Sequence, residues 1–509
     1  MRNKLILSIA LLSLLPSIAS SQDVREANFQ FKQENYQLAL KLYLGAFKKD
    51  TGNVDYNYAI GICRVKTNSA PSEALPHLLK AEKKYGQESE FLMALSYAYL
   101  YNYDFENARA TLKKAEAKLK GSPDIALLNT YIDNAEKMVK SPLDVTFVNM
   151  GKSFNSEMDE TTPMLSADGE MLFYTTNRKF DPAIKIFTPD IYYSIVESGD
   201  FKKSRPVAIN SPDDEYLAGL SNSGEELYFR LDGEDAWEDL VVSKIENKTL
   251  KGKTPFPATV NSKELENGAY STASGDTLYF SSNRSGGFGG SDLYYSVRLP
   301  NGDWSPAVNL GNQINSAYDE TFPMLSADGT KFYFSSNGEN SMGGFDVFVC
   351  DINAKTGEIG TPKNIGYPLN DAFDNMTISY SPDGNYAYVS AIKPDSYGYA
   401  DIYRVVFNDK DPMVRMYLVK LVTQQGDQTA DFGETERNLK VTVFTKNKTI
   451  YGTYNYNPTA SQVPVALLPG SYTLEIEGET IEPFSMKINV PNAPGKPIEN
   501  IKAVVKPKK

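Results

Sequence analysis

Five glycines constrain the fold of this chain more than any other feature, because each belongs to the same pattern at nearly constant spacing. They lie 51 to 55 residues apart, at Gly169, Gly224, Gly275, Gly329 and Gly384. An asparagine precedes each glycine by 14 residues, at Asn155, Asn210, Asn261, Asn315 and Asn370. A strand-like alternating segment such as KFYFSSN follows each glycine, and an aspartate then opens a second one, as in DIY. The chain therefore contains five copies of one structural unit.

A unit of a few short strands cannot bury both faces of its own sheet, so the copies must stack on one another. Radial stacking of such units gives a β-propeller. The segment VNMGKSFN at 148–155 aligns with VNLGNQIN at 308–315. The first strand should therefore complete a sheet whose other strands come last, near 401–407. We expect a ring of about five blades, closed by this seam.

A different period governs residues 27–140, where apolar residues follow helical spacing and glycine is scarce. Companion helices are expected at 57–63 and 92–100, with small residues where two helices cross, and a capping helix at 125–139. The pattern predicts three helical pairs and a cap. Its repeated sets start 35 and 34 residues apart and are Ala39, Tyr43 and Ala46; Ala74, Leu78 and Ala81; and Ala108, Leu112 and Ala115.

The last hundred residues lack the glycine repeat and contain strand-like segments such as KVTVFTK and FSMKINVP. The segment LLPGSYTLEI at 467–476 resembles the turn and strand of the carboxypeptidase regulatory-like domain, a small β-sandwich. An immunoglobulin-like sandwich fits the same residues equally well. We expect a multidomain chain with boundaries at 22–142 for the helical repeats, 143–410 for the propeller and 411–509 for the sandwich.

The N-terminus indicates export. Arg2 and Lys4 precede the apolar run from Leu5 to Leu15, and small residues then offer a cleavage site, so residues 1–21 are expected to be a signal peptide. A retained membrane anchor is the alternative, but the run is shorter than the roughly 20 residues of a spanning helix. Cys63 and Cys350 are expected to be buried thiols in different domains. A net charge of −12 argues against nucleic acid as a partner.

Few residues suit catalysis. His77 is the single histidine, which leaves no Ser-His-Asp triad and no multi-histidine metal site. We therefore expect no enzyme, no cofactor and no metal. Carboxylates recur at Asp159-Glu160, Asp213-Asp214-Glu215 and Asp319-Glu320. They could ring a channel mouth and bind a cation or basic peptide, but hydrogen bonding within the repeat is favoured because residues found in every copy usually serve the repeat. Asp328, likewise, is expected to hold a turn.

Three resemblances carry the functional expectation. SPDG at 381–384 and TLYFSSNRSGGFGGSDLYY at 277–295 resemble the TolB-type, PD40 or WD40-like propeller repeat, and the helical sets resemble tetratricopeptide repeats. Their order, with a regulatory-like domain last, resembles the PorE-type periplasmic proteins of the Bacteroidota type IX secretion system. The chain departs from that family because it has no lipid-attachment cysteine near the cleavage site and no OmpA-like domain after Lys509, so peptidoglycan contact is not implied.

The resemblance implies a non-enzymatic periplasmic scaffold, not an integral membrane protein. It would associate with the outer membrane through other envelope proteins of a secretion or gliding machine. The groove of the helical repeats is the expected partner-binding surface, with Asn57, Tyr58, Tyr97 and Tyr101 as candidate contacts. The alternative is a propeller-based protein that binds or processes glycans or peptides. Of the two tryptophans, Trp304 is expected to pack in the fold.

Overall fold

The computed structural model of the chain describes most of its residues. The predicted export signal lies outside them as far as position 14. No helix in the described part combines the length and the apolar character needed to cross a bilayer. The described residues are 15–68, 70–181, 186–197, 200–232, 238–326, 328–353, 356–382, 384–408, 415–425, 428–432, 439–456, 461–490 and 498–508.

The N-terminal part is helical, as the periodicity predicts. Side chains of Asn35, Asn53 and Asp104 accept backbone N–H bonds and so fix where three of the helices begin. The described helices are α2 (Leu15–Lys32), α3 (Tyr36–Phe47), α4 (Val54–Thr67), the 3₁₀ turn η1 (Pro71–Glu73), α5 (Ala74–Tyr85), α6 (Ser89–Tyr101), α7 (Phe105–Glu116) and α8 (Pro123–Met138).

The helices pack as antiparallel neighbours around small residues. Ala74, Leu78 and Ala81 of α5 are fully buried, and Ala108 and Ala115 of α7 repeat that arrangement. The expected close crossing occurs at Gly61, where a Cβ atom would lie 2.5 Å from Cγ of Leu78. The helical elements are thus confirmed, and their identity as tetratricopeptide repeats stays a prediction.

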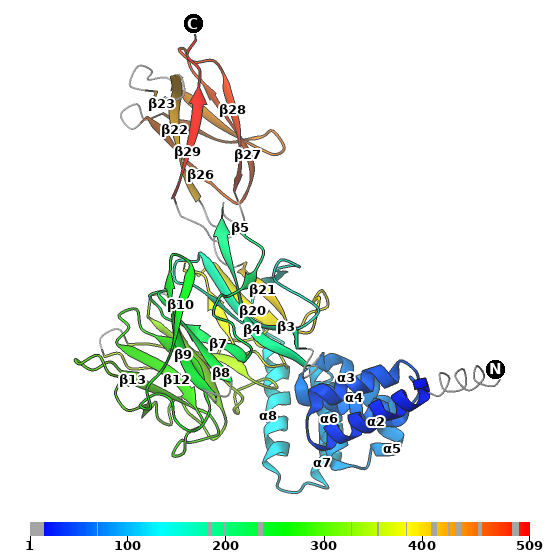
Figure 1. Cartoon of the computed structure of the whole chain (residues 1–509). Helices are drawn as coiled ribbons and strands as arrows, with labels where there is room; N and C mark the ends of the chain where they lie inside the picture. The colour runs from blue at the N-terminus through cyan, green and yellow to red at the C-terminus, as the bar shows by residue number, and fades with distance from the viewer. Residues whose placement is uncertain are drawn as a thin grey trace, which may run out of the picture.

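The region that follows is a propeller-like β domain of small antiparallel sheets (Figure 1). Within the described residues five sheets form it. The first sheet contains β2 (Glu160–Leu165), β3 (Met171–Asp181), β4 (Ile186–Glu197), β5 (Asp200–Phe201) and β6 (Arg205–Pro206). The second contains β7 (Asp214–Leu220), β8 (Glu226–Asp232), β9 (Asp239–Glu246) and β10 (Thr249–Pro255). The third contains β11 (Glu266–Ser271), β12 (Thr277–Ser282), β13 (Asp292–Val297) and β14 (Val308–Asn309).

The fourth sheet contains β15 (Glu320–Leu325), β16 (Lys331–Ser336), β17 (Asp346–Asp351) and β18 (Lys363–Asn364).

The fifth sheet, which we call the seam sheet, joins the start of the domain to its end. The seam sheet contains β19 (Ile378–Tyr380), β20 (Tyr386–Ala391), β21 (Asp401–Phe407) and, from the start of the domain, β1 (Val145–Asn149). Val145 pairs with Phe407, and Asn149 pairs with Tyr403. The expected pairing of the first strand with the last is therefore present.

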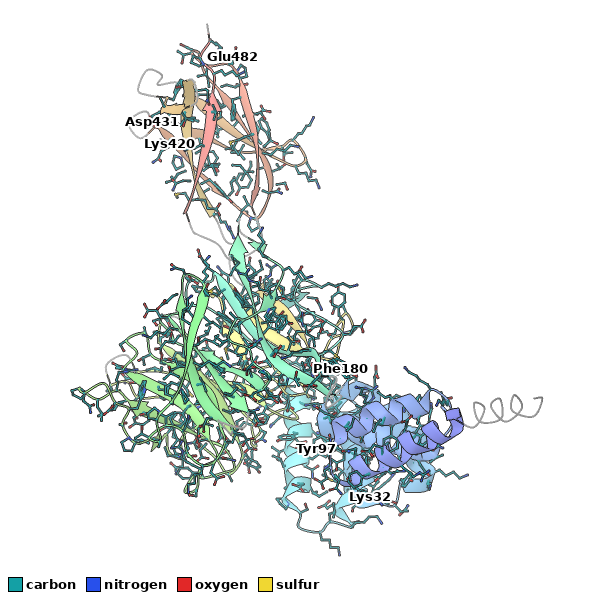
Figure 2. The ribbon with its side chains drawn as sticks, viewed as in Figure 1. Lys32, Tyr97, Phe180, Lys420, Asp431 and Glu482 are labelled. Atoms are coloured by element: carbon teal, nitrogen blue, oxygen red, sulfur yellow. The ribbon has the colours of Figure 1, made fainter. Side chains whose placement is uncertain are left out.

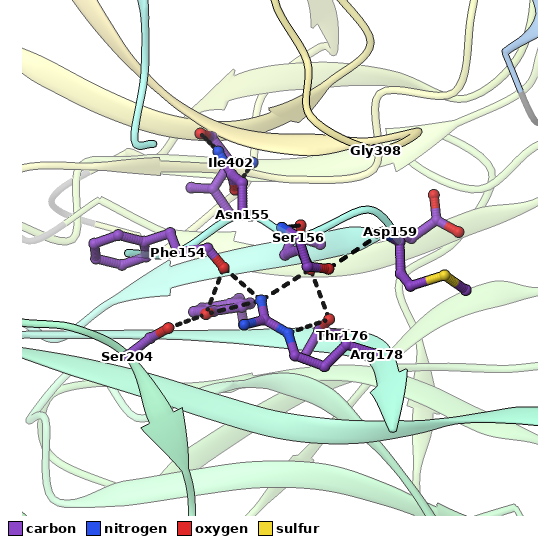
Figure 3. A network of polar contacts seen from close by, with 12 residues as sticks. Phe154, Asn155, Ser156, Asp159, Thr176, Arg178, Ser204, Gly398 and Ile402 are labelled. Atoms are coloured by element: carbon purple, nitrogen blue, oxygen red, sulfur yellow. Dashed lines mark hydrogen bonds and ion pairs between the residues drawn. The ribbon is translucent and has the colours of Figure 1, made fainter. Parts of the chain in front are cut away.

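The repeated asparagines fasten each sheet to the next segment of chain. Each side-chain amide accepts from the N–H and donates to the C=O of one residue in a sheet's third strand, as a neighbouring strand would. Asn315 does so with Leu293, at 2.8 and 2.9 Å. Asn155 does so with Ile402 at 2.8 and 3.1 Å, across the seam (Figure 3). The other three pairs are Asn210 with Ile191, Asn261 with Leu240 and Asn370 with Val347.

The first copy departs from the expected pattern. The repeat predicts that Asp190 opens the second strand after Gly169, but that strand, β4, begins at Ile186, four residues before Asp190. The β3–β4 hairpin is longer here because Phe180 and Phe187 pack against each other at its tip, with ring centroids 5.1 Å apart. Asp190 then pairs with Lys179 of the same hairpin, at 3.2 Å.

Two further sheets form the C-terminal part and enclose one core, in which Val419, Val441 and Leu474 are fully buried. Figure 1 shows this part projecting from the β domain, away from the helices. One sheet contains β22 (Arg415–Gln425), β23 (Gln428–Asp431), β26 (Gln462–Leu467) and β29 (Ile498–Val505). The other contains β24 (Lys440–Thr445), β25 (Ile450–Asn455), β27 (Gly470–Glu477) and β28 (Phe484–Val490).

The asparagine bonds predict a stability difference within one loop. Asn315→Ala would leave the buried N–H of Leu293 without a partner, while its C=O keeps the N–H of Leu310, so we expect a loss of about 1–3 kcal/mol in the free energy of unfolding. Asn312→Ala, the same change at an exposed position three residues earlier, should cost less than about 0.5 kcal/mol. Urea unfolding of both variants measures the difference, and equal losses would contradict the structural role.

Candidate functional site

The helical part and the β domain share a packed interface. Met342 and Ala372, from two loops of the β domain, are fully buried in the same apolar cluster as Tyr101 and residues of α8. The Tyr101 ring lies 5.4 Å from that of Phe373. Because these side chains form one continuous core, the two parts have a fixed relative position.

Polar contacts from α8 reinforce this interface. The Tyr131 hydroxyl donates to the carbonyl of Asn337. The Asn134 amide donates to the carbonyls of Glu339 and Ser341, at 2.8 and 2.9 Å. Helix α8 therefore holds the loop that follows β16, and Figure 1 shows it running between the other helices and the β sheets.

A second contact lies at the tip of the β3–β4 hairpin. The Lys41 ammonium of α3 lies 5.0 Å from the ring centroid of Phe187 and 5.6 Å from that of Phe180. Such cation–π contacts favour a fixed geometry of charge and ring. Figure 2 places Phe180 and Tyr97 along the same boundary between helices and sheets.

Two adjoining cavities open along this boundary. The groove cavity, of about 610 Å³, lies between α6, α8 and the loop that carries Gly343, Gly344 and Phe345. The mouth cavity, of about 300 Å³, lies where the inner strands β2 and β3 meet the loop after α4. Both are lined by Thr67, Asn68 and Asp374. We call the two together the composite cleft.

Tyrosines form the floor of the groove cavity. Tyr101 is only 6% exposed and Tyr97 is half-buried, with their ring centroids 6.0 Å apart. Among the described residues, neither hydroxyl has a hydrogen-bond partner. Burial, together with the carboxylates of Asp124 and Asp374, raises the pKa of Tyr97 to about 12. Both tyrosines therefore present neutral hydroxyls to the cavity.

Carboxylates form its rim. Glu90, Asp124 and Asp374 line the groove cavity and are exposed. In the described part of the chain, no lysine or arginine forms a salt bridge with any of the three. Lys66 is the basic residue that lines the same cavity. The rim therefore carries an excess of negative charge.

The four candidate partner contacts have different positions in the structure. Tyr97 and Tyr101 line the groove cavity, and the β domain covers part of Tyr101. Asn57 is fully buried and bonds within the helices. Tyr58 stacks on Tyr85 with ring centroids 4.0 Å apart. The structure thus brings two of the four to the cleft and holds Asn57 and Tyr58 inside the helical packing.

His77 is half-buried between helices. Its Nδ1 lies 2.8 Å from Oδ1 of Asn57. Nδ2 of Asn57 already donates to the carbonyls of Thr51 and Asn53, so its Oδ1 accepts and His77 Nδ1 carries the proton. Burial, with Arg64 and Lys80 nearby, lowers the pKa of His77 to about 4. The imidazole is therefore neutral at pH 7.

The carboxylates of the recurring glutamates accept hydrogen bonds from neighbouring residues of the β domain. The N–H and hydroxyl of Ser156 donate to Glu160 at 2.8 and 2.6 Å, and Thr176 and Arg178 donate to the same carboxylate (Figure 3). Burial raises the pKa of Glu160 against these bonds. Glu215, Glu266 and Glu320 are bonded by serines in the same way. This geometry favours the structural interpretation of the repeated acids.

Aspartates at the start of the third strand of a sheet close the loop before that strand. Asp292 accepts the N–H bonds of Phe288 and Gly289, and Asp401 accepts those of Tyr397 and Gly398. These glycine loops approach the next segment closely: a Cβ at Gly289 would lie 1.9 Å from the carbonyl oxygen of Tyr318. The glycines of SGGFGGSD therefore serve contact between neighbouring sheets.

Turns and thiols take structural positions as well. The Ser326 hydroxyl and the Thr330 N–H donate to Asp328, whose pKa these bonds lower, and Gly329 has a φ of +68°. Cys63 and Cys350 are buried free thiols, and burial raises the pKa of each to about 12. Trp304 is buried, and Trp237 lies outside the described residues. No group of His, Cys, Asp or Glu able to hold a metal occurs in the described residues.

The composite cleft includes residues that the sequence did not single out. Asp374 and Phe345 come from loops between sheets, and Asp124 from the start of α8. Asp374 follows Asn370 by four residues, as Asp319 follows Asn315, but the repeat does not reveal that it lies near Asp124, because the two meet only when the helices dock on the β domain. The one usable signal was the tyrosine pair on α6, four residues apart and so on one face.

Comparison with known proteins gives structural likeness at low similarity. No protein-family model matches the chain, and no curated protein matches it. Among solved structures, TolB from Acinetobacter baumannii is 15% identical, with 56% of this chain and 70% of that chain covered and a TM-score of 0.30. Puromycin hydrolase is 10% identical, with 69% and 55% covered and a TM-score of 0.29. Bacteroides ovatus xyloglucan PUL GH43B is 10% identical, with 66% and 78% covered and a TM-score of 0.27. Scores this low carry no functional argument.

The α8 contacts predict how the interface responds to one lost amide. Asn134→Ala removes two hydrogen bonds to the loop at 337–341, so we expect hydrogen exchange of that loop to rise about 5- to 20-fold. Asn129→Ala, on the exposed side of the same helix, should leave it unchanged. Exchange measured by mass spectrometry compares the two, and a similar rise in both would show that the bonds do not hold the loop.

His77 predicts a pH dependence of stability. Its folded-state pKa lies below its ordinary value of about 6.5, so as the pH falls the unfolded chain binds the proton first. Stability is therefore lost between pH 6.5 and 4, by about 1 kcal/mol once solvent screening of this half-buried group is allowed for. His77→Gln should lack that loss. Urea unfolding at pH 7.0 and 4.5 measures it, and identical pH slopes in both proteins would refute the effect.

Proposed function

We propose that the protein is a non-enzymatic periplasmic scaffold that holds a partner polypeptide in the composite cleft. The observation that carries this proposal is the continuity of the groove cavity with the mouth cavity through Thr67, Asn68 and Asp374. A concave helical surface is a common recognition site for extended segments. Here it is closed on one side by the β domain, which gives an entering segment a second wall.

The use of the repeated polar groups supports a scaffold. The asparagines and buried glutamates of the β domain form hydrogen bonds that hold the sheets together, as expected of a rigid binding platform. In this proposal each of the five sheets is one blade, the helices are tetratricopeptide repeats and the C-terminal sheets form a sandwich. The type IX secretion or gliding machinery, with its envelope partners at the outer membrane, is the proposed setting.

A second candidate function comes from the mouth cavity. Asp159, Asp371 and Asp374 line it together with Thr161 and Thr162. Carboxylates and hydroxyls in one cavity suit binding or processing of a glycan or peptide. Turnover of such a substrate that is lost in Asp159→Asn and Asp371→Asn variants would favour this function over the scaffold.

Site-specific crosslinking in the native cell envelope tests the scaffold. Tyr97→p-benzoylphenylalanine places a photoreactive group in the cleft, and Leu127→p-benzoylphenylalanine places one on the facing helix α8. We expect both to crosslink to the same polypeptide. Tyr99→p-benzoylphenylalanine, two residues along α6 and outside the cleft, is the matched control. No adduct at 97 or 127, or an equal adduct at 99, would overturn the proposal.

A further inference from the structure

The charge of the composite cleft points to the chemistry of its occupant. We propose, on the basis of the scaffold function above, that the cleft binds a cationic side chain, arginine in particular, carried by an extended segment of the partner. Among the described residues, Lys66 is the single basic residue that lines either cavity. The carboxylates that line them are Glu90, Asp124, Asp159, Asp371 and Asp374. Asp371 is paired with Lys393, and Asp159 and Asp374 each accept one backbone N–H, so Glu90, Asp124 and the second oxygen of Asp374 carry most of the free negative charge.

The tyrosine floor is a second observation, independent of the charge. Tyr101 is 94% buried, lines the groove cavity, and within the described residues its hydroxyl has no hydrogen-bond partner. Because Tyr101 lines the cavity, its phenol oxygen can accept a hydrogen bond from a donor group that enters it. The hydroxyls of Tyr97 and Tyr101 are therefore available to accept hydrogen bonds from a ligand.

The possible acceptors belong to one cavity. Tyr97, Tyr101, Asp124 and Asp374 all line the groove cavity. The paired rings of Tyr97 and Tyr101 add aromatic surface that attracts a cation.

Arginine fits this set better than other side chains. Its guanidinium presents five N–H donors in a rigid plane, bonds well to carboxylates and stacks on aromatic rings. A lysine ammonium has three donors on a flexible stem and would satisfy fewer of the acceptors at once. An acidic segment would be repelled by the rim. The rim carboxylates attract the basic segment to the cleft, and the hydroxyls of Tyr97 and Tyr101 accept hydrogen bonds from its side chain.

Peptide binding to the full-length protein tests the inference. The probes are three fluorescein-labelled octapeptides in which arginine, lysine or glutamate alternates with serine, and fluorescence anisotropy in 0.15 M NaCl gives their Kd values. We expect the arginine peptide to bind at least threefold more tightly than the lysine peptide, and the glutamate peptide not to bind. Cellohexaose, added as a neutral competitor, should not displace the arginine peptide, and displacement would overturn the inference.

Three double variants separate the site from general attraction. Asp124→Asn with Asp374→Asn should raise the Kd of the arginine peptide at least tenfold. Glu475→Gln with Glu477→Gln, on the C-terminal sheets, removes the same charge and should change it less than twofold. Tyr97→Phe with Tyr101→Phe removes only unpartnered hydroxyls, so the fold should persist while the Kd rises at least threefold. Equal weakening by both acidic pairs, or no binding to the wild type, would overturn the inference.

The result can be separated from that of the scaffold proposal. A benzophenone at position 97 crosslinks any occupant whatever its charge. An adduct in the envelope that persists undiminished in the Asp124→Asn, Asp374→Asn background would therefore leave the scaffold in place and refute the cationic ligand. Absence of any adduct would refute the scaffold itself, and with it the inference that rests on it.

Discussion

The side-chain amide of one asparagine per repeat is the interaction on which the β domain depends. It offers an acceptor and a donor to the backbone of a third strand, and so extends each sheet by one residue taken from the next segment. This arrangement needs both atoms of the amide, which neither aspartate nor serine supplies. The same bond across the seam, from Asn155 to Ile402, ties the start of the domain to its end. The glycine loops and buried glutamates then pack between sheets whose positions the asparagine bonds have fixed.

That fixed frame gives the helices a firm surface to dock on. Met342 and Ala372 enter the helical core from loops whose positions the neighbouring asparagine and aspartate bonds determine. The composite cleft is a consequence, because its two walls belong to different parts of the chain. A change in the β domain can therefore alter the groove without touching a groove residue.

The sequence predicted the repeated elements well and the cleft poorly, for a physical reason. Periodic residues such as Ala74 and Leu78, or the turn glycines, take their structure from local geometry that is written in their spacing. Asn57 shows the limit: its position in the groove helix suggested contact with a partner, but its amide is directed to His77 and two carbonyls. Asp124 and Asp374 lie 250 residues apart, and no local pattern links them before the two parts dock. The first copy also escaped prediction, because the Phe180–Phe187 contact extends its hairpin beyond the repeat.

The seam has a mechanical consequence. Val145 follows directly from the helical part and pairs with Phe407, which leads into the C-terminal sheets. The two strands are antiparallel, so both connections leave from the same end of the pair. A force that draws the helices and the C-terminal sheets apart would load the ladder one rung at a time, starting at Val145, with no shear along its length. Tension between the two ends of the molecule would thus open the seam sheet at a defined point, the pair of Val145 with Phe407.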